Sequence, residues 1–124
     1  MKQNMVAWFE IPVNDMDRAK DFYESVFNIE INYQDVGGVM MGFFPANPEA
    51  PGAMGSLMKY ESYIPSQEGS LIYFSSNDVQ IELDRIVNSG GKILQAKAQI
   101  SPEVGYMGMF LDTEGNRIAL YSQK

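Results

Sequence analysis

The chain carries the same short pattern twice, and this repetition limits the possible folds more than any other feature. Asn14-Asp15-Met16 and Asn77-Asp78-Val79 lie 63 residues apart in a sequence of 124 residues. Each Asn-Asp pair follows a short apolar run, 6–13 in the first copy and 70–75 in the second, and precedes a stretch of helical periodicity. An internal repeat of this kind predicts one structural unit built twice.

The segments that follow each repeat predict the same order of elements. Residues 17–27 place their apolar side chains on one stripe, which predicts an amphipathic helix capped by Asn14 or Asp15. A second stripe runs over 79–87, and Gly90-Gly91 supplies a left-handed stop. Three strands are predicted after each helix, at 29–36, 39–44 and 53–60, and at 92–100, 105–111 and 117–122. Each copy therefore reads β-α-β-β-β.

Neither copy is large enough to bury its own sheet, so we expect a single domain over 1–124. The first βαβββ module is predicted at 1–60 and the second at 70–124, with a polar, proline-containing linker at 61–69. Two such modules would pair their sheets to form one core or one cavity. The predicted fold class is α+β.

Composition argues against several classes of function. The net charge is −7, with 9 basic and 16 acidic residues, which disfavours nucleic acid and anionic membranes as partners. No apolar run reaches the roughly 20 residues that span a bilayer, and the N-terminus lacks the apolar stretch of a secretory signal. The chain has no cysteine, which fits a cytoplasmic protein. With no histidine either, Ser/His and Cys/His nucleophile pairs are impossible.

Three segments together resemble the vicinal oxygen chelate superfamily, which holds glyoxalase I, bleomycin-resistance proteins and extradiol dioxygenases. They are Trp8 to Val13 leading into Asp17 to Tyr23, Asn88 to Lys92, and Asp112 to Leu120. The resemblance covers essentially the whole chain. It implies two βαβββ modules that pair curved mixed sheets around an open cavity, with the helices outside.

The same resemblance implies four strand positions that hold metal ligands in metal-dependent members. They correspond to Trp8, Leu71 and Ala119 and, through the offset of 63 residues, to Ser56. Tryptophan, leucine and alanine side chains cannot coordinate a divalent cation, and one serine hydroxyl is a poor ligand. We therefore expect no metal and no other cofactor.

Side chains alternate across a strand, so the resemblance also predicts which residues line the cavity. If Trp8 faces the cavity, Glu10 does too, whereas Phe74, Ile118 and Leu120 pack beneath the helices. The ligand contacts expected besides Trp8 are Ser56, Met58, Leu71, Tyr73, Arg117, Ala119 and Tyr121. This lining is mostly aromatic and apolar, as small-molecule pockets usually are.

Glu10 is the candidate acid or base, because apolar neighbours such as Trp8 would raise the pKa of its carboxyl by desolvation. The alternative is that Glu10 forms a buried ion pair with Arg117 or a lysine. Tyr73 and Tyr121 either hydrogen-bond a ligand or pack as ordinary aromatic residues. Trp8 either walls the cavity or fills the space that a metal would occupy.

Three functions follow from these residues. The first is metal-independent binding of a small apolar or aromatic molecule in the cavity. The second is a metal-free enzyme of the lyase or isomerase type that uses Glu10 as acid or base. The third is an interaction module with a filled cavity. A homodimer is what the resemblance implies for assembly.

Overall fold

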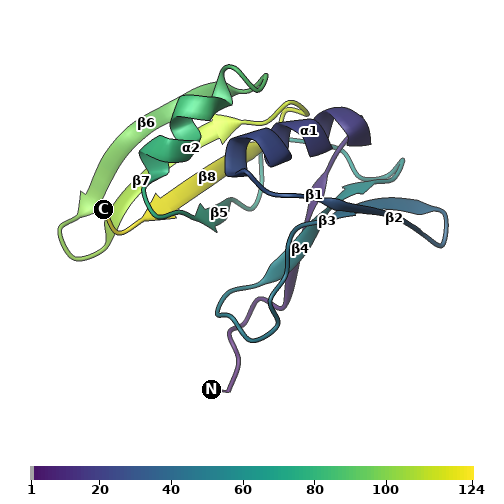
Figure 1. The fold of residues 1–124 in the computed structure, drawn as a ribbon, viewed down its shortest axis with the longest axis horizontal. Helices are drawn as coiled ribbons and strands as arrows, with labels where there is room; N and C mark the ends of the chain where they lie inside the picture. The colour runs from purple at the N-terminus through teal and green to yellow at the C-terminus, as the bar shows by residue number, and fades with distance from the viewer. Residues whose placement is uncertain (1) are drawn as a thin grey trace.

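The computed structural model describes residues 2–124 as two similar modules joined by a linker (Figure 1). The first module contains β1 (Trp8–Pro12), α1 (Met16–Phe27), β2 (Asn32–Val36), β3 (Val39–Phe43) and β4 (Met54–Lys59). The second contains β5 (Ile72–Ser75), α2 (Val79–Ile86), β6 (Lys92–Ser101), β7 (Gly105–Leu111) and β8 (Arg117–Ser122). The predicted α+β class and the β-α-β-β-β order of both modules are confirmed.

Each module forms one four-stranded mixed sheet. Sheet A has the order β1-β4-β3-β2 and sheet B the order β5-β8-β7-β6. The first strand of each sheet pairs in parallel with the last, and the remaining pairs are antiparallel. Glu10 lies opposite Ser56 in sheet A, and Tyr73 lies opposite Ala119 in sheet B. Both members of the second pair lie 63 residues after those of the first, so the repeat extends to strand register.

The ends of α1 are set by local hydrogen bonds. Asp15 caps the N-terminus, because its side chain accepts from the backbone N–H of Arg18 at 3.0 Å. At the other end Asn28 adopts a left-handed conformation with φ 54°. The side chain of Glu24 then accepts from the backbone N–H of Ile31 at 2.8 Å. The strand predicted from residue 29 begins only at 32 because the intervening residues cap the helix.

One hydrophobic core joins the two modules. It includes Ile11 and Leu57 from sheet A and Ile118 and Leu120 from sheet B, all at most 2% exposed. The helices lie close to the sheets because glycines stand beneath them. A Cβ atom at Gly108 would lie 2.8 Å from Leu83 of α2, and one at Gly42 would lie 3.0 Å from Ile31 and 3.2 Å from Met16 of α1.

Helix α1 contacts the inner faces of both sheets. Its Phe22 ring lies 5.8 Å from Phe110 in β7, and its Tyr23 ring lies 5.5 Å from Phe44, the residue after β3. Helices α1 and α2 therefore form a layer between the sheets of one chain, and the opposite face of each sheet points outward (Figure 1). The expected packing of Phe74, Ile118 and Leu120 on the helix side is confirmed.

A buried polar cluster fixes the β7–β8 turn against α1. Glu114 accepts hydrogen bonds from the backbone N–H groups of Asn14 and Asp15, both at 2.8 Å, and from Arg18 Nε at 2.8 Å. Burial acts to raise the pKa of Glu114, but the hydrogen bonds from Arg18 and the two backbone groups outweigh it. The pKa of Glu114 therefore lies below its ordinary value. A carboxylate of the second module thus caps the helix of the first.

Tyr23 and Asp112 form the second contact of this cluster. The Tyr23 hydroxyl donates to Asp112 Oδ2 at 2.7 Å, and the pKa of Tyr23 is raised well above its ordinary value by burial and by the nearby Asp112 charge. Burial also raises the pKa of Asp112, although four hydrogen bonds, two of them from Asn116, oppose that shift. Within residues 2–124, no helix is long and apolar enough to cross a membrane.

Candidate functional site

The outward side of sheet A is an apolar surface that we call face A. Ile11 and Leu57 point to the core, so their neighbours along β1 and β4 point outward. The members of face A on β1, β3 and β4 are Trp8, Glu10, Pro12, Met41, Phe43, Met54, Ser56 and Met58, and Asn32 and Gln34 of β2 lie at its edge. Trp8 is 40% exposed, and its ring meets that of Phe43 edge-on with centroids 6.0 Å apart. Aromatic and thioether groups thus lie side by side on an open sheet surface.

Face A contains two polar groups in direct register. The Ser56 side chain is fully buried between its strand neighbours, and its hydroxyl has no hydrogen-bond partner among the described residues. Glu10 lies opposite it on β1 and is half-buried. The ion pairs found in residues 2–124 do not include Glu10, so the alternative of a Glu10–Arg117 ion pair is not met. Glu10 and Ser56 therefore form one polar pair among the apolar side chains of β1, β3 and β4, and the polar residues Asn32 and Gln34 lie at the β2 edge.

The outward side of sheet B is a second such surface, called face B. Its members are Tyr73, Ser75, Met107, Met109, Leu111, Arg117, Ala119 and Tyr121. Tyr73 is 51% exposed, whereas Ala119 is buried between longer neighbours. The Tyr121 hydroxyl donates to the carbonyl of Val104 in the β6–β7 turn. Arg117 donates from Nη2 to the Gly69 carbonyl at 3.3 Å, while its buried Nε has no partner in the described part of the chain.

The residues expected to line a single cavity are thus divided between two surfaces. Trp8, Glu10, Ser56 and Met58 lie on face A, and Tyr73, Arg117, Ala119 and Tyr121 lie on face B. The helices pack between the two sheets, so faces A and B are separate surfaces over most of their extent. Glu10 and Arg117 do line one small pocket of about 140 Å³ beside the linker.

The residues at the four positions predicted from the resemblance to hold metal ligands do not suit a divalent cation. Trp8, Leu71 and Ala119 offer no donor atom, and Ser56 offers one hydroxyl. Over residues 2–124 there is no group of three or more Asp, Glu, His or Cys side chains that could hold an ion. The donor set therefore gives no basis for a metal-assisted step at this site.

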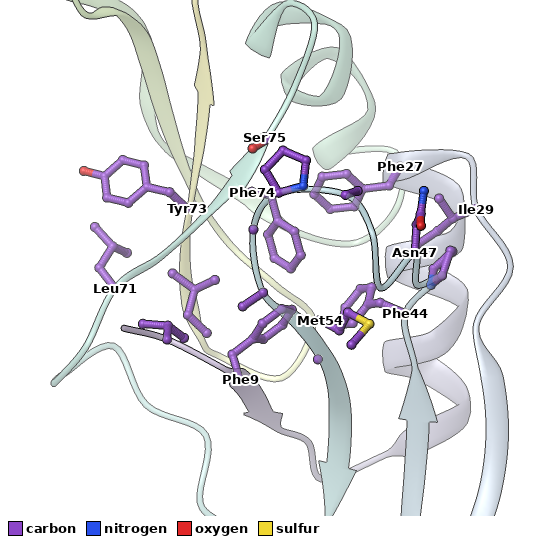
Figure 2. A pocket seen from close by; sticks show the side chains of 18 residues that line it. Phe9, Phe27, Ile29, Phe44, Asn47, Met54, Leu71, Tyr73, Phe74 and Ser75 are labelled. Atoms are coloured by element: carbon purple, nitrogen blue, oxygen red, sulfur yellow. The ribbon is translucent and has the colours of Figure 1, made fainter. Parts of the chain in front are cut away.

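A larger pocket lies where the two modules meet, and we call it the inter-module pocket (Figure 2). Its volume is about 620 Å³. The lining consists of Val6, Phe9, Phe27, Ile29, Phe44, Pro45, Asn47, Ala50, Pro51, Gly52, Ala53, Met54, Gly55 and residues 71–75. Leu71 and Tyr73 are the only sequence-predicted contacts among them. The phenylalanines were missed because strand alternation assigns Phe9 and Phe74 to the buried side.

Comparison with known proteins identifies the family of this chain. The family model of the Glyoxalase/Bleomycin resistance protein/Dioxygenase superfamily matches residues 5–120. The chain belongs to this superfamily. A "Glyoxylase-like domain-containing protein" of Didymella fabae is 29% identical over 118 residues, which cover 93% of this chain and 91% of that protein.

Solved structures of superfamily members share the fold of this chain. Glyoxalase I from Zea mays superposes with a TM-score of 0.70 at 17% identity, over 94% of this chain and 45% of that one. This chain therefore spans slightly less than half the length of the Zea mays enzyme. TnmS3, an antibiotic binding protein from Streptomyces sp. CB03234, superposes with a TM-score of 0.68 at 23% identity, over 100% of this chain and 99% of that one. At these identities the likeness concerns the fold.

Proposed function

We propose that this protein binds a small apolar or aromatic molecule, without a metal, between face A of one chain and face B of a second. The observation that carries the proposal is face A itself. Trp8, Phe43 and a row of methionines form an open apolar surface around one buried, unpartnered hydroxyl. Methionine side chains adapt to varied apolar shapes, and a single polar point fixes the orientation of a ligand.

A second chain is part of the proposal because the two half-sites lie on separate surfaces of one chain. Trp8 on face A and Tyr73 on face B are both about half exposed, at 40% and 51%, which is high for large aromatic residues. A twofold arrangement would place face A of each chain against face B of its partner. Two equivalent cavities would result, each lined by the sheets of both chains with the helices outside.

The relatives are consistent with binding rather than with one reaction. TnmS3 covers nearly the same length as this chain and is named as an antibiotic binding protein. Glyoxalase I is a longer chain, and the residues here do not fit a divalent cation at the four corresponding positions. A bound antibiotic-like or other aromatic molecule therefore suits this site better than the metal-dependent chemistry that the resemblance implies for other members of the superfamily.

Trp8 is the only tryptophan of the chain, so its fluorescence reports on face A directly. We expect neutral naphthalene and indole derivatives to quench it saturably, with the same affinity in the presence of EDTA. The variant Met41→Glu should abolish quenching because it places a charge on face A. Tyr33→Glu is the matched control, since Tyr33 lies on the neighbouring strand β2 but on the other face of the sheet. Quenching that requires a divalent cation would refute the metal-independent part of the proposal.

A second candidate function is acid–base catalysis by Glu10. It is favoured by one observation, the half-buried Glu10 carboxylate outside every ion pair of residues 2–124 and beside a buried hydroxyl. For an enzyme of this kind, Glu10→Gln should abolish turnover while leaving the quenching of Trp8 by the substrate intact. Turnover that survives the substitution would exclude Glu10 as the acid or base. A dimer in which no compound quenches Trp8 would instead support an interaction module.

A further inference from the structure

The inter-module pocket is lined without a single charged side chain. In a chain with 20% charged residues and a net charge of −7, its 18 lining residues include no Asp, Glu, Lys or Arg. Polar side chains are limited to Asn47, Tyr73 and Ser75. Transfer of an ion into such surroundings is costly, since no lining group could compensate its charge. The lining therefore selects against charged occupants.

The interior of the pocket is built from phenylalanine rings. Phe74 lies 5.6 Å from Phe9, 5.4 Å from Phe44 and 4.9 Å from Phe27, measured between ring centroids. Figure 2 shows these side chains converging, with Tyr73 and Leu71 to one side and Asn47 on the opposite side. Aromatic rings at such spacings favour a further ring in offset or edge-to-face contact. The surface presented to an occupant is therefore suited to a flat aromatic group.

Two local features keep this surface open. A Cβ atom at Gly55 would lie 2.5 Å from the Phe9 ring, so only glycine lets that ring lie against the backbone of β4. The loop between β3 and β4 forms one wall and is folded on itself, because Asn47 accepts from the backbone N–H of Glu49 at 3.0 Å and its carbonyl accepts from Ala50 at 3.0 Å. The volume of about 620 Å³ lies within the usual range for small-molecule sites.

From these observations we infer that the inter-module pocket is a second binding site, selective for neutral, flat aromatic molecules. All of its lining residues come from one chain, so the site does not depend on the proposed dimer, although Met54 of face A and Tyr73 of face B form part of its wall. The uncharged lining sets the preference for neutral ligands, and the phenylalanine cluster sets the preference for planar rings. Asn47, Tyr73 and Ser75 supply the polar groups that could bind a polar substituent, and at Asn47 this is the amide N–H group, because its oxygen already accepts from Glu49.

A pair of fluorescent probes tests this site. N-phenylnaphthylamine is neutral and aromatic, and anilinonaphthalene sulfonate adds an anionic group to a similar scaffold. The titrations use the Trp8→Ala variant, in which face A is disabled, so a failure of the proposed function does not affect them. We expect saturable binding of one neutral probe per chain and roughly tenfold weaker binding of the anionic probe. The difference should persist at high salt, where long-range repulsion by the acidic chain is screened.

Loop variants locate the probe. In the Trp8→Ala background, Ala50→Phe combined with Ala53→Leu fills the wall of the pocket without altering the core, and should weaken neutral-probe binding by roughly tenfold. Ala46→Phe is the matched control, because Ala46 lies in the same loop, is exposed and does not line the pocket. Absence of saturable binding, equal binding of both probes, or equal effects of the filling and control variants would each overturn the inference.

Discussion

Ser56 of β4 lies directly opposite Glu10 of β1, and its hydroxyl is buried without a hydrogen-bond partner among the described residues. An unsatisfied buried hydroxyl costs stability, so Ser56→Ala should leave the free energy of unfolding unchanged or raise it by up to about 1 kcal/mol. The same variant should bind polar aromatic compounds roughly fivefold more weakly, because a ligand that displaces the flexible side chains of Met54 and Met58 beside Ser56 loses its hydrogen bond to the hydroxyl. Chemical denaturation and Trp8 titration measure the two effects.

Ser122 offers a matched control for that substitution. It is equally buried, at 1% exposed, but its hydroxyl accepts from the backbone N–H of Val79 at 3.1 Å and donates to the Lys124 carbonyl at 2.8 Å. Ser122→Ala should therefore lower the free energy of unfolding by about 1–2 kcal/mol. If Ser56→Ala is as destabilising as Ser122→Ala, the Ser56 hydroxyl has a partner and is not free to meet a ligand.

The hydrogen bond between Tyr23 and Asp112 joins α1 to the β7–β8 turn inside the core. Tyr23→Phe removes the donor and leaves a buried carboxyl oxygen with fewer partners, so we expect a loss of about 1–3 kcal/mol in the free energy of unfolding. Tyr33→Phe changes the same group at a site that is 46% exposed, and should alter stability by less than about 0.5 kcal/mol. Urea unfolding of both variants decides the matter, and similar midpoints would contradict a stabilising role for Tyr23.

The lowered pKa of Glu114 predicts a pH dependence of stability. Folding favours the ionised form of this carboxyl, so its contribution is present above the ordinary pKa of 4.5 and is lost as pH falls through the lower pKa of the folded state. Glu114→Gln should lower the free energy of unfolding by about 2 kcal/mol at neutral pH. The difference in free energy of unfolding between Glu114→Gln and the parent chain should shrink as the pH falls through the lowered pKa of Glu114.

Arg18→Gln provides an independent check on the same cluster. It removes the Arg18 hydrogen bond and ion pair that help to lower the pKa of Glu114, while the backbone donors at Asn14 and Asp15 remain. The acid-side loss of stability should therefore persist in Arg18→Gln at reduced size. Denaturant unfolding at several acidic pH values measures this loss. If Glu114→Gln and Arg18→Gln both keep the pH dependence of stability of the parent chain, Glu114 is not the group responsible.

The sequence predicted the module and its register because both depend on local periodicity. Side chains alternate along β8, so once Ile118 and Leu120 are assigned to the core side, Ala119 must lie on the opposite side of the sheet. The offset of 63 residues matched Ser56 to Ala119, and the registers show the two at equivalent places, opposite Glu10 and Tyr73 respectively. Strand starts were predicted less well, since the use of residues 29–31 to cap α1 depends on the side chain of Glu24.

The arrangement of the two modules could not be predicted in the same way. Both sides of sheet A carry large apolar groups, with Phe9 and Ile11 on one side and Trp8 and Phe43 on the other. Hydrophobicity alone therefore does not predict which side of sheet A packs against the helices of the same chain. That choice is made by long-range contacts such as the one between Phe22 and Phe110. The inter-module pocket results from the same long-range packing of the two modules, so no local sequence pattern could predict it.

A subunit-mixing experiment tests most directly whether the ligand lies between face A of one chain and face B of another. Trp8→Ala disables face A and removes the only tryptophan, whereas Tyr73→Ala disables face B and keeps Trp8 as reporter. Tyr73→Ala alone should show no saturable quenching by a neutral aromatic ligand, because each of its cavities contains one altered half. Trp8→Ala alone has no tryptophan signal and serves only as the donor of an intact face B.

Refolding the Tyr73→Ala chain with an excess of the Trp8→Ala chain forms mixed dimers, which native mass spectrometry verifies. In these dimers the remaining Trp8 faces an intact Tyr73 of the other chain, so we expect saturable quenching with the affinity of the parent protein. Verified mixed dimers in which quenching does not return would contradict a site shared between two chains.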